Sequence, residues 1–536
     1  MSPQYHLVDL PDEVLLSMAI ELSLADLLSF MLSCRRFFTL IAQSSLMQYL
    51  IRVMRNGLYD PLITDMSIPQ RVRALETWER AWLELSVSEP LRRYRLSAIG
   101  LDDPKRCRVQ SGILIGTQLN NLHLSGEYCY LDFLNLLGQS STVSRINIPN
   151  VGGDAHVQSR TYVPESDLMV IIFQANGGRG SPKFQFHQFS TGSEHPSAAN
   201  YCVEFDQILT ARATCVECCG DNMVAVILDG EEMGSQKSDY VFLIEWKIGR
   251  ITQLRKVEPG TYGTLVTFLS SDTLVFALRD AFALQVCKLT RAGRNSAPTL
   301  QTLCSLQLPC LLSDQQISDL HLAQPSSLSG NPPSSAQHSL SSFPFRSNPE
   351  DDILAFEIFF RDNHGRRIIF IARRRTLLWL AIPTGSGASM PPDTRAWEDW
   401  GPRTTHWMEL DPSNDSMSLA GSRCVLVKYS HLRNHYVLDL RDFNPYRVRA
   451  RRARNNNNNS KAVTTAGITT QAILSAEACF EEDVVSELPF ISIRKENVGW
   501  RVFLDDEWMA EILWDQDEKA NIQFRTITAP ADVWAR

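Results

Sequence analysis

The sequence predicts a chain with two architectures: a helical N-terminal part, then a large all-β part arranged as a β-propeller of about seven blades. Three observations predict this α + all-β multidomain fold. Apolar residues recur at helical spacing up to about residue 86. From residue 91, short β-rich stretches alternate with Gly, Asn, Asp, Pro and Ser, and no helical pattern alternates with them as a parallel α/β fold requires. The expected boundaries are 5–50 for the first helices, 51–90 for a helical linker and 91–536 for the β region.

Composition restricts the class of protein. The chain has 536 residues, too many for one core of ordinary size, and its net charge of −8 argues against a nucleic-acid partner. No apolar run approaches the ~18 residues that span a bilayer, and the N-terminus lacks a signal-peptide pattern. Twelve cysteines without framework spacing indicate reduced thiols. We therefore expect a cytoplasmic or nuclear protein, with neither a membrane nor a nucleic acid as partner.

The first predicted helix starts at Pro11, where the missing N–H of proline is tolerated, and runs to about Leu22. Its polar residues are Glu13, Ser17 and Glu21, which are spaced four apart and form one narrow stripe. The remaining residues from Val14 to Leu22 are apolar. This helix is therefore apolar over most of its circumference, which is unusual for a helix at a protein surface.

A second helix is expected over residues 24–33, with Ser23 as N-cap and Asp26 reaching back to it. It repeats the single polar stripe, and a third helix starts near Arg35. Three helices in about 40 residues cannot hide so much apolar surface by themselves. The excess surface predicts an interface, either with the rest of the chain or with another protein.

Several different residue types of this segment form one pattern: Leu10-Pro11-Asp12-Glu13-Val14-Leu15, then Leu22, then Asp26-Leu27-Leu28, then Cys34-Arg35-Arg36-Phe37. This pattern resembles the F-box motif, and the likeness covers residues 7–50. It departs from the family pattern at Ser33 and at Met18-Ala19, where aliphatic or bulkier residues are usual.

The resemblance implies a partner, the Skp-type adaptor of a cullin–RING ubiquitin ligase, and through it a cullin. It also implies which side chains meet the adaptor. The alternative is an ordinary buried helical hairpin, which the apolar circumference disfavours. The implied adaptor-binding residues are Leu10, Pro11, Val14, Leu15, Leu27, Leu28 and Phe37.

Two further helices are expected before the β region. Ser45-x-x-Gln48 predicts a helix start, with Gly57 just past its end. Ser67 and Pro69 predict the start of a helix of about 18 residues, roughly 27 Å long. Such a helix is either a stiff spacer or a helix packed on the next domain, and the two are compatible.

The β region contains one recurring element, an aromatic residue three positions before a glycine. Phe189 with Gly192 and Trp246 with Gly249 fit a strand followed by a tight turn. The second pair resembles the strand and turn of WD-type repeats, although Lys247 replaces the usual Asp. This element favours a propeller over the alternative of two stacked β-domains.

Three segments are predicted to be disordered surface insertions between strands: 324–350 and 383–394, which are rich in Pro, Ser or Gly, and 447–467, which joins an Arg cluster to an Asn run. The C-terminal stretches "VLDLRDFNPYRVR" and "LPFISI…WRVFLDDEWMAEI" resemble the tail of large fungal F-box proteins with a β-rich region.

Candidate sites for chemistry are few. Cys215-Val-Glu-Cys218 has no second ligand pair for zinc, and buried free thiols are the simpler interpretation. The acidic cluster 505–507 fits a hairpin turn. The five arginines within 447–454 suit a nuclear import signal, an anion-binding loop or a solvated disordered loop. "NGGRGSP" (176–182) lacks phosphate-loop spacing and fits a hairpin loop. We expect no catalytic, cofactor-binding or metal-binding residue.

The leading hypothesis is therefore a non-enzymatic substrate receptor of a cullin–RING ligase, with adaptor-binding helices and a target-binding β region. Two alternatives stay open. The chain is a scaffold that binds the adaptor without a cullin, or it is an enzyme built on a propeller with acidic residues at its central channel. The identity of the target cannot be read from the sequence.

Overall fold

The structure is a computed structural model, and only the following residues are described. They are 7–60, 66–85, 92–95, 108–110, 113–118, 129–135, 143–148, 156–163, 166–174, 182–189, 191–205, 211–229, 238–257, 265–293, 296–322, 344–361, 366–382, 393–411, 415–457, 466–476, 479–504, 508–514 and 520–526.

Five helices form the N-terminal part, and all but α1 begin at a residue whose side chain caps the helix. Ser23, Cys34 and Ser44 each accept a backbone N–H three residues later, and Ser67 forms a capping box with Gln70. A short 3₁₀ turn, η1 (Leu7–Asp9), precedes them. The helices are α1 (Asp12–Ile20), α2 (Leu24–Ser33), α3 (Arg35–Gln43), α4 (Ser45–Arg55) and α5 (Ile68–Glu84).

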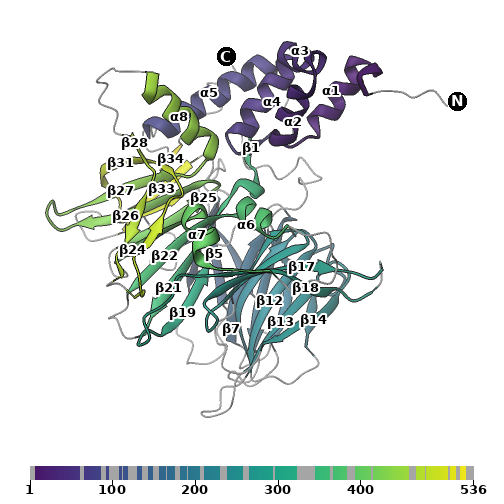
Figure 1. The fold of residues 1–536 in the computed structure, drawn as a ribbon. Coiled ribbons are helices and arrows are strands. Elements are labelled where there is room, and N and C mark those ends of the chain that lie inside the picture. Colours follow the sequence, from purple (N-terminus) through teal and green to yellow (C-terminus); the bar gives the residue numbers. More distant parts are fainter. Residues whose placement is uncertain are drawn as a thin grey trace.

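Seven sheets of four or five strands make up most of the rest, and they lie beneath the helices (Figure 1). Apart from one parallel pair, their strands are antiparallel. The first three sheets, in spatial order, are β3 (Arg108–Gln110), β4 (Ile113–Gln118), β5 (Cys129–Asn135), β6 (Val143–Ile148); β7 (His156–Val163), β8 (Leu168–Gln174), β9 (Lys183–Gln188), β10 (Cys202–Glu204); and β11 (Ala211–Cys219), β12 (Asn222–Asp229), β13 (Ser238–Glu245), β14 (Arg250–Val257).

The next three sheets take in strands from distant parts of the chain. They are β15 (Leu265–Ser270), β16 (Thr273–Leu278), β17 (Ala283–Thr290), β18 (Thr299–Gln307), β23 (Asp393–Arg395); β19 (Ile317–Leu322), β21 (Ile353–Phe360), β22 (Arg367–Arg373), β24 (Thr405–Leu410); and β25 (Ser416–Ala420), β26 (Arg423–Ser430), β27 (His435–Asp442), β31 (Phe490–Val498), β28 (Ala466–Thr469).

The seventh sheet joins the two ends of the β region. Its strands are β32 (Arg501–Leu504), β33 (Trp508–Trp514), β34 (Ala520–Thr526) and β2 (Arg92–Arg95). Strand β2 follows the helices, yet it pairs with β34, from Arg92 opposite Phe524 to Arg95 opposite Asn521. The first strands of neighbouring sheets also contact one another: β7 with β11, β11 with β15, β15 with β19, β25 with β32 and β32 with β3.

Two small sheets complete the described strands. One of them, β1 (Leu58–Tyr59) with β20 (Arg346–Ser347), attaches the segment between α4 and α5 to the segment before η7. The other is β29 (Ala472–Leu474) with β30 (Val484–Ser486).

Helices also occur inside the β region, which the sequence did not lead us to expect. The apolar stretch 376–383, which is one of the short stretches after residue 91 that predict strands, lies mostly in helix α6 (Arg374–Leu380). An apolar run this short has no clear periodicity, so a helix and a buried strand are hard to distinguish. The other elements are α7 (Trp397–Thr404), α8 (Pro445–Asn457) and the 3₁₀ turn η7 (Pro349–Asp351).

Parts of all three predicted insertions are ordered. Residues 344–350 contain β20 and the start of η7, and Phe345 is buried. Residues 393–394 begin β23, and α8 and β28 occupy both ends of 447–467. The prediction of disorder was wrong for these parts because tertiary contacts, not local composition, hold them. The remainder, 324–343, 383–392 and 458–465, lies outside the described residues.

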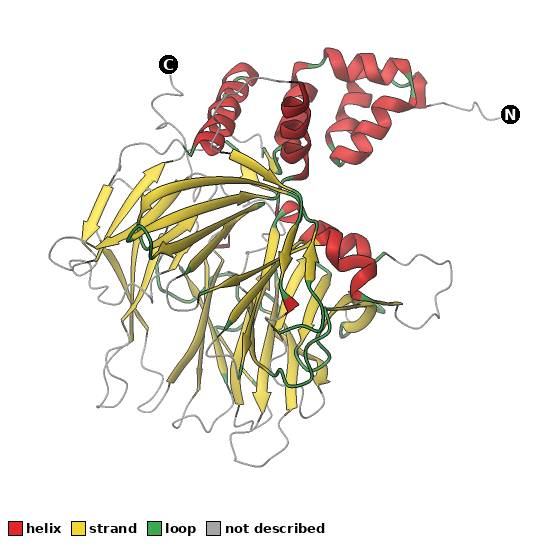
Figure 2. Ribbon diagram, turned by 60° about the vertical axis from the view of Figure 1, so that its left-hand side comes forward, coloured by secondary structure: helices red, strands yellow, loops and turns green. Residues whose placement is uncertain are grey.

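One hydrophobic core joins the helices to the last sheets. It contains Ala19 and Leu27 from the first helices, Trp78 from α5, and Val425 and Ile493 from the β region. Figure 2 shows the helices in red as a layer on one end of the yellow strands. The helical part is therefore packed on the next domain, as one of the two compatible interpretations predicted. Within the described residues, no helix has the length and apolarity needed to cross a bilayer.

Candidate functional site

Exposed apolar side chains are concentrated on the first three helices. Eight of the thirteen exposed large hydrophobic residues of the described chain lie within 32 positions. A concentrated apolar surface of this kind is typical of a protein interface, whereas isolated exposed residues are normal. We call these eight the helical apolar surface: Leu7, Val8, Val14, Met18, Ile20, Leu28, Leu32 and Phe38.

The seven residues predicted to bind an adaptor divide into two groups. Leu10, Pro11, Val14 and Leu28 are at least partly exposed, and Val14 and Leu28 belong to the helical apolar surface. The other three point into the core, so a partner cannot reach them directly in this conformation; they support the surface from within. These buried residues are Leu15, Leu27 and Phe37.

Arg36 joins the two ends of the motif. From α3, its guanidinium donates to the carbonyl oxygen of Val8, to that of Leu10 at 3.0 Å and to the Asp12 carboxylate at 2.6 Å. This contact fixes the chain just before α1, where Leu10 and Pro11 lie. It gives a structural reason for an arginine in Cys34-Arg35-Arg36-Phe37.

The other residues of that stretch have structural roles too. Cys34 caps α3, its sulfur accepting the backbone N–H of Phe37 at 3.5 Å. The Phe37 ring stacks on Phe30 of α2, with ring centroids 4.1 Å apart. Stacked rings add to the free energy of burial, so α2 and α3 form one rigid hairpin.

Exposed charged residues lie on the same segment as the helical apolar surface. They are Asp9, Glu13, Glu21, Asp26 and Arg35. Protein–protein interfaces combine an apolar centre with a polar rim, so a segment of this composition is suited to binding a folded partner.

A second set of residues fixes α4 and α5 on the β region. Trp78 and Trp82 of α5 are buried, and the Arg423 guanidinium lies 4.5 and 4.2 Å from their ring centroids. Arg447 of α8 also lies over Trp78, at 4.7 Å. Cations over indole rings are strongly favourable when desolvated.

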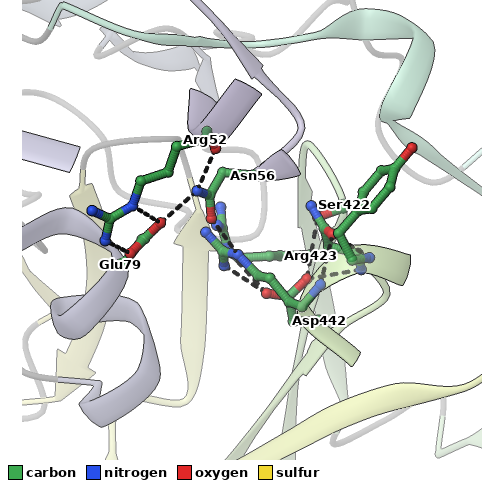
Figure 3. A network of polar contacts seen from close by, with 9 residues as sticks. Arg52, Asn56, Glu79, Ser422, Arg423 and Asp442 are labelled. Atoms are coloured by element: carbon green, nitrogen blue, oxygen red, sulfur yellow. Dashed lines mark hydrogen bonds and ion pairs between the residues drawn. The ribbon is translucent and has the colours of Figure 1, made fainter. Parts of the chain in front are cut away.

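A polar network continues this contact (Figure 3). The amide of Asn56 donates to Glu79 of α5 at 2.6 Å and accepts from Arg447 at 2.9 Å. Arg447 also donates to the Asp442 carboxylate at 2.7 Å, which Arg423 approaches to 3.8 Å. Burial raises the pKa of Asp442, but the charges of Arg447 and Arg423 outweigh it, and the pKa lies below its usual value.

Little in the sequence indicated this network. The arginines of 447–454 suit an import signal, an anion-binding loop or a solvated loop, yet Arg447 is bonded inside the protein, whereas Arg449 and Arg452 are exposed. A useful signal was the preceding Asn444, whose side chain caps α8 by accepting the N–H groups of Tyr446 and Arg447. That cap marks the segment as a helix.

The remaining candidates for chemistry gain no support. Cys218 and Cys219 are buried on β11, and burial raises the pKa of Cys219 to about 11. In the described ranges, no three His, Cys, Asp or Glu side chains are grouped so as to hold a metal ion. Segment 505–507 and residues 176–181 lie outside the described residues.

No family model matches the sequence, and no curated protein matches it. Among solved structures, an oligogalacturonate lyase in complex with manganese is 9% identical, with a TM-score of 0.39, covering 84% of this chain and 96% of its own. The WD40 domain of SCAP from fission yeast is 8% identical, with a TM-score of 0.33, covering 83% and 98%. Hsv2 of Kluyveromyces lactis is 8% identical, with a TM-score of 0.31, covering 63% and 79%. At these scores the similarities carry no conclusion about activity or partners.

Proposed function

We propose that the chain is a substrate receptor of a cullin–RING ubiquitin ligase, which binds a Skp-type adaptor through the helical apolar surface. The observation that carries the proposal is the concentration of exposed apolar residues on the segment that resembles an F-box. Val14 and Leu28 belong to both the resemblance and that surface. An exposed patch of this kind is best explained by a partner that covers it.

The receptor itself does no covalent chemistry in this proposal. It holds a target protein near the ubiquitin-conjugating enzyme, and so raises the effective concentration of a target lysine. Such a role requires a rigid path between two binding surfaces. The shared core and the polar network between α5 and the last sheets support this role.

We further propose that the seven sheets are the blades of a closed propeller that binds the target. Pairing of β2 with β34 supports closure, because it joins the first strand of the β region to the last. Contacts between the first strands of neighbouring sheets support a ring. Gly192 and Gly249 have φ of 72° and 68°, which suits the tight turns expected after Phe189 and Trp246.

Co-purification with the adaptor tests the proposal. The variant carries Val14→Asp and Leu28→Asp, which place charges on the helical apolar surface without entering the core. We expect wild type to bind and the variant to lose at least ~100-fold in affinity, since several buried contacts are lost. Leu432→Asp is the matched control, because Leu432 is 99% exposed and lies on the β26–β27 hairpin.

The outcomes separate the hypotheses. Failure of wild type to bind the adaptor, or equal binding by the double variant, contradicts the proposal. Adaptor binding that never recruits a cullin favours the scaffold instead. Recruitment of the cullin by wild type but not by the double variant supports a ligase receptor.

A further inference from the structure

Arg447, a member of the basic cluster 447–454, makes contacts in three directions. Its Nε donates to Asn56 at the end of α4, its Nη1 donates to Asp442 at the end of β27, and its guanidinium lies over Trp78 of α5. Two helices of the N-terminal part and one sheet therefore meet at a single side chain.

Asn56 connects the helical part to the β region because its side-chain amide has both a donor group and an acceptor oxygen. The NH₂ group donates to Glu79 Oε1 at 2.6 Å and to the Arg52 carbonyl at 2.9 Å. The oxygen accepts from Arg447. A carboxylate in its place would still accept from Arg447 but would repel Glu79, so the neutral amide is needed at this position.

The chain around Asn56 is enclosed by distant segments. Gly57 has φ of 69°, and its carbonyl accepts the N–H of Asn348 at 2.8 Å. A Cβ at Gly57 would lie 3.3 Å from the Asn444 side chain. The end of α4 is thus held between the segment before η7 and the start of α8.

From these contacts we infer that Arg447, Asn56 and Asp442 form a latch that fixes the orientation of the docking helices on the β region. Breaking it loosens α4 and α5 while the sheets stay folded. A buried ion pair that also spans two elements is a device for a specific arrangement, since unpairing one partner leaves a buried charge. The consequence for ubiquitin transfer rests on the proposed function; the latch itself does not.

Hydrogen exchange of the full-length chain tests the latch. In Arg447→Gln we expect residues 45–55 and 68–84 to exchange at least ~10-fold faster than in wild type, while β12 and β16 stay within twofold. Arg452→Gln is the matched control on the exposed face of the same helix, and it should leave exchange unchanged. Equal exchange of α4 and α5 in Arg447→Gln and wild type overturns the inference.

A milder variant covers the case in which Arg447→Gln unfolds the whole chain. Arg447→Lys keeps the charge, but a single ammonium cannot bond both Asn56 and Asp442 as a guanidinium does. We expect an intermediate increase in exchange, confined to α4 and α5. Exchange in Arg447→Lys equal to that of wild type, or raised equally in every sheet, overturns the latch.

The functional readout distinguishes the two proposals. With the latch broken, adaptor affinity should stay within about twofold of wild type, because the helical apolar surface is intact, while ubiquitin transfer to a bound target falls several-fold. If wild type does not bind the adaptor, the proposed function is wrong, but the hydrogen-exchange test of the latch remains valid. Unchanged transfer in a variant with loosened helices would show that the latch does not serve the ligase.

Discussion

The first three helices and the next two differ in how much of their apolar surface the chain covers. Each of α1, α2 and α3 buries two residues, such as Leu15 and Ala19 in α1. Helix α4 buries four apolar residues, and α5 buries five, including Trp78 and Trp82. Both groups are rich in apolar residues, but the second group buries more of them in each helix. The difference teaches that α4 and α5 are held by the chain, while α1 to α3 present a surface.

The largest expected effect comes from removing a covered side chain. Trp78→Ala should lower the free energy of unfolding by about 3–5 kcal/mol, because it creates a cavity and removes the surface beneath Arg423 and Arg447. Denaturant unfolding measures this. Trp379→Ala, at a position that is 67% exposed, is the control and should change stability by less than about 0.5 kcal/mol. Equal losses in both variants would contradict the comparison.

A fall in pH should destabilise α4 and α5 before it affects α1 to α3. The folded-state pKa of Asp442 lies below its unfolded value, so its stabilisation is present above the unfolded pKa and is lost as pH falls through the folded one. Exchange measured at falling pH should therefore increase first in α4 and α5. Asp442→Asn should lose about 3 kcal/mol at neutral pH, since it unpairs buried arginines, and should abolish that pH dependence. An unaltered acid response in Asp442→Asn would rule out this assignment.

A smaller effect is expected from the contact that orders the start of α1. Arg36→Met removes three hydrogen bonds to residues 8–12, but the ion pair with Asp12 is exposed, so the loss should be about 1 kcal/mol. Adaptor affinity should fall more than stability does, because Leu10 and Pro11 are no longer positioned. Arg35→Met is the control, as Arg35 is exposed on the same helix. Similar affinities for both variants would refute a positioning role.

The smallest losses of stability are expected from removing the N-caps of two helices. Ser23→Ala and Ser67→Ala each remove an N-cap and should cost about 1 kcal/mol or less. Thermal unfolding should detect the loss at Ser67, because α5 belongs to the shared core. At Ser23 we expect local fraying of α2 by hydrogen exchange, with a smaller change in Tm. A larger Tm change for Ser23→Ala would reverse the comparison.

Local structure was predicted well wherever a cap and a periodic pattern coincided. The second helix was expected over 24–33, and it spans Leu24–Ser33. The start of α4 was misplaced by one residue, since Ser44 is the cap and not Ser45. Helix α6 was missed because its apolar run suits a helix or a strand equally. These errors arise where the local sequence favours two structures and the tertiary environment chooses.

The candidate site was predicted in part for the same reason. The apolar helices could be predicted from the sequence, and so could Val14 and Leu28 as residues of their surface. That Leu15, Leu27 and Phe37 are buried could not be predicted in this way. Which face of a helix is covered depends on its neighbours in space. The pairing of Asn56 with Arg447 joins residues 391 positions apart, and no local pattern encodes such a contact.

The sequence by itself determined where helices begin, that strands follow, and that the first helices carry more apolar surface than they can bury. These properties depend on residues a few positions apart, through caps, periodicity and composition. Only the tertiary structure decided which apolar faces are covered, that β2 completes the last sheet, and that Arg447 is bonded inside the protein. Those outcomes depend on residues brought together from distant parts of the chain by burial and charge pairing.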